Sequence, residues 1–365
     1  MTQDRARAFV PIQSLPLPRP LRRFGPAFPS AVAEHYAALH VPWGGAVVDP
    51  LPYPYSAADA VERSGGRGLG APEDALATWA RRTIRAAPGE EETLAALERV
   101  GDSVRTGGVP HRAAMRELYT SHCRSCHAPV VIEAFMSERA VPARARRAFR
   151  CGVCARDGRS LLIEIAGAED EERARAIDPR GPAFRDLVDR FGDDRRLGES
   201  VAVLYTPRNL EALMATVDAV ESVAEGPAGA LLGLALVEVI VCGSSDGAPP
   251  LIERGRARRR HGGGPRREVN IWLEYERTVR ELAAWLQADA LPRGRGRDHA
   301  VGTAGGTGAD LVLFAAPIQD LLGGWADVAS AICLGAHAPR EHDRVTAGPC
   351  ATTRASTENG PSVRA

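Results

Sequence analysis

Lysine is absent from this chain of 365 residues, and all 46 of its basic residues are arginine. Any mechanism that uses a catalytic lysine is therefore excluded. The 46 basic residues are balanced by 46 acidic ones, so the net charge does not mark nucleic acid or a membrane surface as a partner. Aromatic residues are also scarce, at 5% of the chain.

Long hydrophobic runs are missing as well. A membrane span takes about 18–20 apolar residues, whereas the longest apolar run, at 228–242, is shorter and contains Glu238. Residues 1–23 lack the continuous apolar segment of a secretory signal. We therefore expect a cytoplasmic protein that makes no contact with a membrane.

Composition divides the chain into five stretches. Residues 1–29 are rich in Pro and Arg and are expected to form an extended surface arm. A polar tail over 341–365 has the composition of a disordered segment. Between them we expect the first part of an α/β domain at 30–118, a cysteine-containing insertion at 119–165, and a helical region with a last strand at 166–340.

A parallel sheet is predicted from the first of these parts. Residues 45–48 form a short apolar run that closes on Asp49 and Pro50, as a buried parallel strand does at its functional end. A helix at 57–63 and a strand near 68–71 complete a βαβ pattern. Apolar periodicity predicts helices at 90–105, from 207, at 228–242 and at 270–287, and one more strand at 310–314. An acidic stretch at 168–178 and a loop to about 199 follow the cysteine region, and 252–267 is interpreted as a Gly/Arg-rich linker.

Two Cys-x-x-Cys pairs carry the strongest chemical signal. Cys123 and Cys126 form the first pair, and Cys151 and Cys154 form the second after a spacer of 24 residues. Each pair places two thiolates on a tight turn, and two such turns complete a tetrahedron around Zn²⁺. A site with four thiolates is closed, so its role is structural. The alternative is that the cysteines stay reduced or form disulfides and never meet.

The surroundings of the cysteine pairs leave two questions open. His122 and His127 flank the first pair and could replace a cysteine as ligand. Arginines outnumber glutamates between the pairs, which fits either a module that contacts phosphates or a solvated surface. These arginines are Arg139, Arg144, Arg146, Arg147 and Arg150.

A few further residues have simpler structural interpretations. Thr206 and Pro207 predict the start of a helix, because threonine is a good N-cap and proline suits the first helical position. Trp272 and Tyr275 are expected in the core of the protein. His111 has no neighbour in sequence that would make a catalytic arrangement, and we expect it in solvent.

Six sequence pieces follow one another in a characteristic order: VVDPLPYPYSA, GRGLGAPEDA, RELYTSHCRSC with CGVC, LYTPRNLEAL, REVNIWLEYE and DLVLFAAPIQD. This order resembles that of bacterial DNA adenine methyltransferases that use S-adenosylmethionine (SAM). Their motifs run from D-P-F-x-G-x-G and G-V-D-x-N-P through zinc knuckles and (Y/F)-T-P-R-x-L to R-N-P-W-x-x-F and D-P-P-Y. The resemblance covers about residues 25–335. It implies an α/β, Rossmann-like methyltransferase fold with an inserted zinc ribbon, and DNA as a partner.

Both reactive motifs depart from the family's pattern. The glycines of the SAM loop are replaced by Leu51-Pro52-Tyr53-Pro54-Tyr55, in which proline fixes the backbone and tyrosine rings occupy cofactor space. Asp49 and Glu73 remain as candidate cofactor-binding acids. The last motif is degenerate, because alanine stands in place of its catalytic acid and isoleucine in place of its aromatic ring. Its four residues are Ala315, Ala316, Pro317 and Ile318.

These departures remove the chemistry of methyl transfer. The alanine side chain accepts no hydrogen bond from a target amino group, and isoleucine has no π face for a flipped base. We therefore expect a methyltransferase-like protein without catalysis, which either binds DNA or forms the non-catalytic part of a two-chain modification system. About 50 residues follow the last motif, so the expected sheet is incomplete at its C-terminal end and a partner chain is a candidate to complete it.

Two alternatives stay open. The chain could be an active SAM-dependent enzyme with divergent loops, in which Asp49 and Glu73 hold the cofactor. It could also be a zinc-ribbon interaction module whose likeness to methyltransferases is coincidental. A parallel sheet that places 46–49 beside 310–314 would argue against coincidence.

Overall fold

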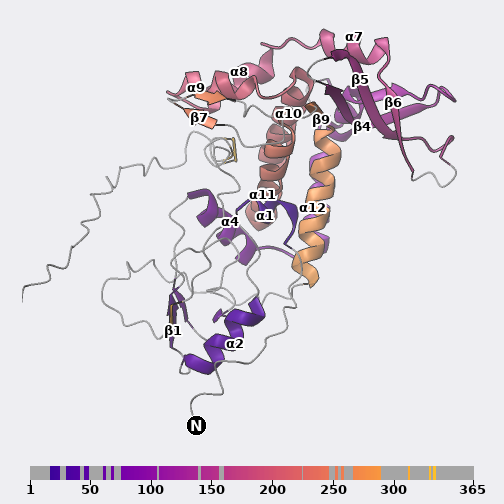
Figure 1. Ribbon diagram of the computed structural model, residues 1–365. Helices are drawn as coiled ribbons and strands as arrows, with labels where there is room; N and C mark the ends of the chain where they lie inside the picture. The colour runs from indigo at the N-terminus through magenta and orange to yellow at the C-terminus, as the bar shows by residue number, and fades with distance from the viewer. Residues whose placement is uncertain are drawn as a thin grey trace, which may run out of the picture.

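The computed structural model has a mixed α/β architecture, whose larger sheet is antiparallel. It describes residues 17–24, 30–41, 45–48, 61–62, 67–69, 75–104, 107–138, 141–155, 160–223, 225–245, 251–253, 256–258, 266–288, 311–312, 329 and 332–333. Figure 1 shows the larger sheet at one end of several long helices and a small sheet near the other end. Within these ranges, no helix combines the length and hydropathy that crossing a membrane requires.

The helices make up most of the described chain. In order they are α1 (Arg19–Arg22), α2 (Ser30–His40), α4 (Ala75–Arg85), α5 (Glu90–Asp102), α6 (His111–Leu118), α7 (Ala168–Ala176), α8 (Pro182–Arg190), α9 (Arg195–Ala202), α10 (Pro207–Val223), α11 (Gly226–Cys242) and α12 (Ile271–Ala288). The four helices predicted from apolar periodicity correspond to α5, α10, α11 and α12. Thr206 caps α10 as predicted, since its Oγ1 accepts a hydrogen bond from the Asn209 amide at 3.2 Å.

The main core lies among α5, α10, α11 and α12, each of which contacts the other three. Helix α11 is the central one, because its residues are buried on every side from Leu234 to Val241. A helix that is apolar all round is stable only when other elements surround it. Trp272 and Tyr275 of α12 are fully buried in this core, as predicted.

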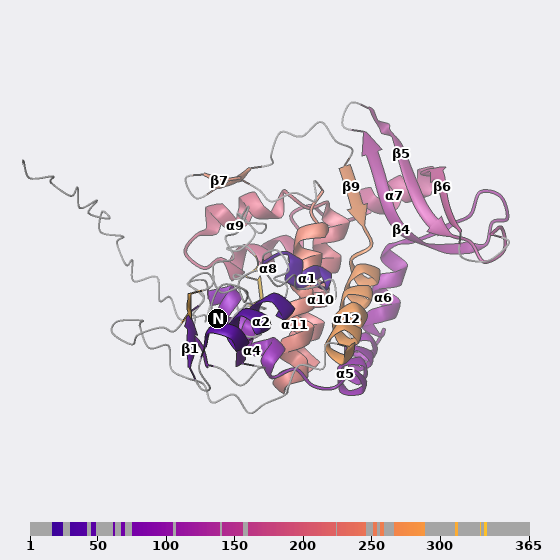
Figure 2. The same cartoon turned by 60° about the horizontal axis from the view of Figure 1, so that its bottom comes forward.

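The larger sheet, which we call the ribbon sheet, joins distant parts of the sequence. Its strands are β3 (Thr120–His122), β4 (Pro129–Glu138), β5 (Val141–Arg150) and β6 (Leu161–Ile165), in that spatial order, and β9 (Arg266–Val269) pairs with β4. All of these pairs are antiparallel. Figure 2 shows β9 between the ribbon sheet and the start of α12.

The expected linker at 252–267 is therefore corrected. Besides the first residues of β9, it contains β8 (Arg256–Arg258) and most of β7 (Leu251–Glu253), which form a small antiparallel hairpin. Strand pairing uses backbone N–H and C=O groups, so strands can form in an arginine- and glycine-rich sequence that has no apolar pattern.

A second sheet contains three short parallel strands. β1 (Ala46–Val48) lies between β10 (Leu311–Val312) and β2 (Arg67–Leu69). Val47 pairs with Leu311 on one side and with Gly68 on the other. The predicted parallel pairing of the two motif strands, far apart in sequence, is thus present. Val47 is fully buried and packs with Val61.

The expected surface arm is wrong for residues 17–24. Leu17, Leu21 and Phe24 belong to the main core, and α1 contacts both α11 and α12. Arg23 donates two hydrogen bonds of 2.8 Å to Glu238 of α11. Its neighbour Arg19 pairs with two acids of α12, so this short helix is tied to the bundle by both apolar and ionic contacts.

The loop expected up to about 199 is also wrong, because it contains α8 and most of α9, and the acidic stretch before it forms α7. Helix α7 has almost no apolar residues and lies over the ribbon sheet, where Asp170 is its buried position. Helix α9 begins at a side-chain cap, in which Asp194 accepts a hydrogen bond from the Leu197 amide at 3.1 Å. The tail at 341–365 lies outside the described residues.

Candidate metal centre

Two tight turns hold the four cysteines. The first turn, Cys123 to Cys126, connects β3 to β4, and the second, Cys151 to Cys154, follows β5. In the first turn the His127 amide donates to the Cys123 carbonyl at 2.8 Å. His127 has a φ of 58°, a left-handed conformation that lets the chain reverse directly after the second cysteine. In the second turn the Ala155 amide donates to the Cys151 carbonyl at 3.0 Å.

The turns bring all four sulfur atoms together. The Sγ atoms lie within 4.8 Å of one another, with 3.6 Å between Cys123 and Cys154 and 3.5 Å between Cys126 and Cys151. A Zn–S bond of about 2.3 Å places the sulfur atoms of a tetrahedral site about 3.8 Å apart. A disulfide would require about 2.05 Å, and the four cysteines are free. The geometry fits a tetrahedral metal ion, and no disulfide joins these four cysteines in the structure.

The thiols of this cluster differ in pKa: a hydrogen bond with Cys126 raises the pKa of Cys154, whereas the pKa of Cys151 is lowered. The Cys154 amide donates to Cys151 Sγ at 3.4 Å, and this hydrogen bond lowers the pKa of the Cys151 thiol to about 7. A thiolate is the form that binds zinc. Cys123 and Cys151 are buried, whereas Cys154 is exposed, so the centre lies at the edge of the fold.

The flanking histidines are not part of this cluster. Among the described residues the cysteines alone form the group, and His122 instead has its Nδ1 atom 3.2 Å from Glu169 of α7. His127 contributes its backbone conformation to the turn. Four thiolates complete a tetrahedral site, and with no open position such a site is structural.

The arginines between the cysteine pairs have different environments. Arg147 is buried and pairs with Asp170 at 2.8 Å and with Glu164 at 3.2 Å, and it also donates to Ser121. Arg150 pairs with Glu133 at 2.6 Å. Arg146 is exposed, while the side chains of Arg139 and Arg144 lie outside the described residues. The arginine-rich composition therefore serves both internal ion pairs and an exposed surface.

A buried arginine connects the ribbon sheet to the helical bundle. Arg208, at the start of α10, lies over the Phe135 ring at 4.5 Å and pairs with Glu268 of β9 at 3.3 Å. Burial raises the pKa of Glu268, and the charge of Arg208 acts in the opposite direction. Thr206 and Pro207 predicted a helix start here, with a DNA or partner contact through Arg208 as a second interpretation, but Arg208 is buried. No local pattern indicates that Arg208 meets Glu268.

Two hydrogen-bonded side chains strengthen the same junction. The Tyr119 hydroxyl donates to Asn209 Oδ1 at 2.9 Å, and burial raises the pKa of Tyr119 well above its usual value, so the donor stays protonated. Asn270 Nδ2 donates to the Ile132 carbonyl at 3.0 Å, and its backbone amide donates to the Glu133 carbonyl at 2.8 Å. The metal centre is therefore part of a sheet that is fixed rigidly to the bundle.

The expectation for His111 is corrected. Its side chain is fully buried, with its ring 4.9 Å from that of Trp272 and its Nε2 atom 3.4 Å from Thr216 Oγ1. His111 begins α6, which packs against α10 and α12. A histidine without a partner nearby in the sequence can still be buried when distant helices converge on it.

The remaining predicted site residues lie outside the described part of the chain. These are the candidate cofactor-binding acids Asp49 and Glu73 and the degenerate motif Ala315, Ala316, Pro317 and Ile318. Asp49 directly follows β1, and Ala315 comes three residues after the end of β10. Their roles therefore remain predictions of the sequence.

Comparisons with known proteins give no match: no protein-family model, curated protein or solved structure is similar enough to this chain.

Proposed function

We propose that this protein is a DNA-methyltransferase-like protein that has lost methyl transfer, keeps a structural zinc ribbon and acts by binding DNA. The strand order β10–β1–β2 supports this proposal most directly. The carboxyl ends of parallel neighbours lie at the same edge of a sheet, which is where α/β proteins bind cofactors and substrates. Strands β1 and β10 both end at that edge, at Val48 and Val312.

The sequence segments that follow these two strands support the loss of catalysis. The segment after β1 carries Pro52 and Pro54 where a SAM loop needs free amides and glycine. The segment after β10 has Ala315 and Ile318 where methyl transfer to adenine needs an acceptor and an aromatic ring. A Rossmann-like domain would thus keep its strand order while both reactive segments have changed. We further propose that additional strands, from this chain or from a second one, extend the three-stranded sheet.

The test is calorimetric titration of the zinc-loaded protein with SAM, followed by a methylation assay on adenine-containing DNA. We expect no heat of binding at SAM concentrations of about 1 mM, a range in which active enzymes are saturated. A variant with Tyr53→Gly and Tyr55→Gly, titrated alongside, shows whether the two rings alone block the cofactor. Binding of SAM by the natural protein at micromolar affinity, or methyl transfer to DNA, would overturn the proposal in favour of an active enzyme.

A further inference from the structure

The ribbon sheet has two different faces. Residues directly opposite each other on antiparallel strands share a face. Arg147 opposes both Phe135 and Glu164, and this face, the inner face, is buried against the helices through Arg208 and Asp170. Arg146 opposes both Met136 and Ile165, and these residues therefore belong to the other side, which we call the outer face.

The register aligns the outer face in rows across four strands. One row runs from Ile165 on β6 through Arg146 and Met136 to Arg267 on β9. The neighbouring row consists of Ile163, Ala148, Ala134 and Val269. Leu161 and Arg150 form the beginning of a third row. In the second row Ile163 is exposed, whereas Ala148, Ala134 and Val269 are buried. The accessible part of the outer face is therefore the β6 side chains together with the first row, in which Arg146 and Arg267 are exposed.

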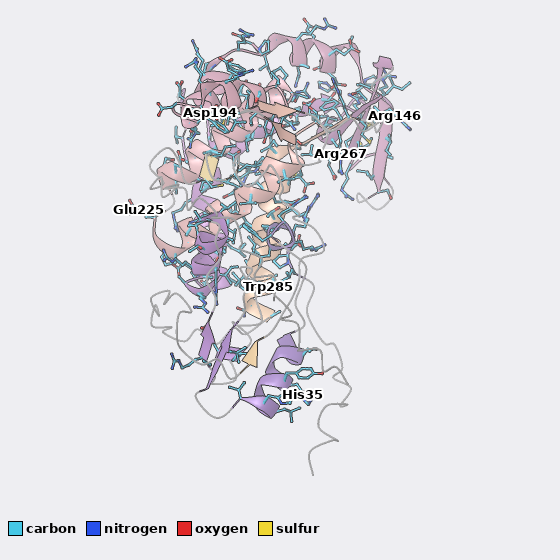
Figure 3. The ribbon with its side chains drawn as sticks, turned by 60° about the vertical axis from the view of Figure 1, so that its left-hand side comes forward. His35, Arg146, Asp194, Glu225, Arg267 and Trp285 are labelled. Carbon is cyan, nitrogen blue, oxygen red and sulfur yellow. The ribbon has the colours of Figure 1, made fainter. Side chains whose placement is uncertain are left out.

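On this face, strand β6 exposes three aliphatic side chains in a row. Leu161, Ile163 and Ile165 are exposed by 48%, 46% and 55%, a continuous aliphatic stripe along one strand. Arg146 and Arg267 are exposed too, and neither has an ion pair with any residue in the described ranges. Figure 3 labels both arginines on the ribbon sheet at the same end of the molecule.

The charge of the outer face is positive. Its acidic neighbour, Glu133, is already paired with Arg150 at 2.6 Å and with Arg277 of α12 at 3.7 Å. Neighbouring strands are about 4.8 Å apart, so Arg146 and Arg267, two strands apart, have their backbones about 10 Å from each other. A ligand that uses both arginines must carry at least two negative groups at a similar spacing.

We propose that the outer face of the ribbon sheet binds the sugar-phosphate backbone of duplex DNA. Arg146 and Arg267 would contact phosphates, and the aliphatic stripe of β6 would lie against the edge of a groove. This inference rests on the proposed function, DNA binding, and assigns that function to one surface of the protein. Arginine is the usual phosphate ligand at such interfaces, and aliphatic side chains there contact sugars and thymine methyl groups. Sites for single strands stack bases on aromatic rings, and none of the outer-face residues named above is aromatic.

A peptide strand added to the edge of β6 is the competing occupant, because the stripe lies on an edge strand. Such a strand would lie next to Leu161, Ile163 and Ile165. Arg267 would be about four strand spacings away, roughly 19 Å, and would stay unused. A duplex, with grooves about 12 and 6 Å wide, is broad enough to contact the whole row from Ile165 to Arg267.

Fluorescence anisotropy with the full-length, zinc-loaded protein and a labelled mixed-sequence duplex tests this assignment over a series of salt concentrations. We expect the double variant Arg146→Ala/Arg267→Ala to bind at least about tenfold more weakly, and to reduce the slope of log K against log salt by about two. Arg146→Lys/Arg267→Lys should keep most of that slope, because it keeps both charges. The control is Arg196→Ala on α9, which removes an exposed arginine elsewhere.

The outcomes of this experiment distinguish an error in the proposed surface from an error in the proposed function. If the natural protein binds the duplex and the double alanine variant binds equally well with an unchanged slope, the outer face is the wrong surface while DNA binding stands. If the natural protein does not bind duplex DNA at all, both proposals fail. Tighter binding to the single strand would overturn the assignment to duplex. Zinc content and circular dichroism of each variant show that a weaker affinity does not come from unfolding.

Discussion

At the scale of single residues, the arginines show how little composition says about position. Arg147 and Arg208 are almost fully buried, with exposed side-chain fractions of 3% and 4%. Each one meets carboxylates on elements that are distant in sequence. A charge that is buried must be paired, and removing its partner costs more than the pair itself contributes. Arg146, one position before Arg147, instead points away from the bundle on the outer face of the ribbon sheet.

The first prediction concerns the metal ligands. Cys126→Ser should reduce the zinc content of the purified protein from about one ion per chain to well below one, because a neutral hydroxyl replaces a thiolate ligand. Zinc is measured by mass spectrometry of the acid-digested protein or by a colorimetric chelator. Chemical denaturation of the same samples reports the accompanying loss of stability.

The matched control for this experiment is Cys242→Ala. Cys242 is a cysteine at the end of α11, outside the four-sulfur cluster. Burial raises the pKa of its thiol, as expected of a cysteine that packs as a small apolar residue. Its zinc content should stay at about one ion per chain. Equal zinc loss in both variants would contradict the assignment of the site.

The sequence identified the four cysteines that cluster and missed the junction residues, and the physical reason is the range of the interaction. Two Cys-x-x-Cys turns are local patterns, so their meeting needs only one further condition, the closing of the ribbon sheet. Arg208 and Glu268 are paired only because α10 and β9 converge. His111 was misassigned for the same reason, since its contacts come from α10 and α12.

At the scale of elements, α1 shows how a proline-rich stretch can be an integral part of the core. Leu21 of α1 and its flanking residues Leu17 and Phe24 are buried and follow helical spacing. That spacing was the signal in the sequence, and the four prolines between 11 and 20 obscured it. Arg23 then reaches Glu238, an acid in the middle of the most apolar helix of the protein.

The second prediction tests this contact. Arg23→Ala should lower the free energy of unfolding by roughly 2–3 kcal/mol, because Glu238 would be left without its cation among apolar residues. The cost is below that of a fully buried pair, since Arg23 retains contact with water at an exposed fraction of 29%. Urea denaturation followed by circular dichroism measures the change.

The neighbouring Arg22→Ala is the control, because Arg22 is 56% exposed and its ion pair with Glu281 is long, at 3.4 Å. Exposed pairs contribute about 0–1 kcal/mol. A loss of stability in this variant as large as in Arg23→Ala would mean that α1 as a whole, rather than the Glu238 pair, carries the effect.

The helices that were predicted from apolar periodicity have an apolar side, whereas α7 and β9, which were missed, do not. Helices α5, α10, α11 and α12 carry an apolar side and were predicted within a few residues. Helix α7 consists mostly of charged residues, so it has no periodic apolar pattern, and no helix was predicted there. Strand β9 pairs through its backbone with β4, more than a hundred residues earlier, and no local sequence pattern encodes that pairing.

At the scale of the whole molecule, the ribbon sheet and the bundle are mechanically joined. Asn270 links them twice, since its side chain and backbone both donate to β4 while its Oδ1 atom accepts from the Leu273 amide in the first turn of α12. A change in the metal centre therefore reaches the bundle through β4. The opposite end of α12, near Leu286, is distant from that route.

The third prediction follows from this connection. Removing zinc with a chelator should increase amide hydrogen exchange in β3, β4, β5 and β9 and in the first turn of α12, while α4 and α11 keep their protection. Hydrogen-exchange mass spectrometry of the zinc-loaded and chelated protein measures this difference. Zinc should restore protection and magnesium should not.

Two other results would contradict this coupling between the metal centre and the first turn of α12. If exchange increased only within the two cysteine turns, the ribbon sheet would be stable without metal. If it increased equally in α4 and α11, the zinc ion would stabilise the entire fold. The effect of zinc would then not depend on the hydrogen bonds of Asn270. Each outcome is distinguishable peptide by peptide.

The separation of β4 from β9 in sequence also sets an order of events during synthesis on the ribosome. Both cysteine turns have been translated by Cys154, long before β9 begins at Arg266. The nascent chain can therefore load its metal while the sheet around it still lacks a strand. The bundle closes only when α12 has emerged, and the strand β10 joins β1 last of all, at Leu311. Metal supply acts at the beginning of this vectorial assembly, ahead of every long-range contact that later fixes the ribbon in place.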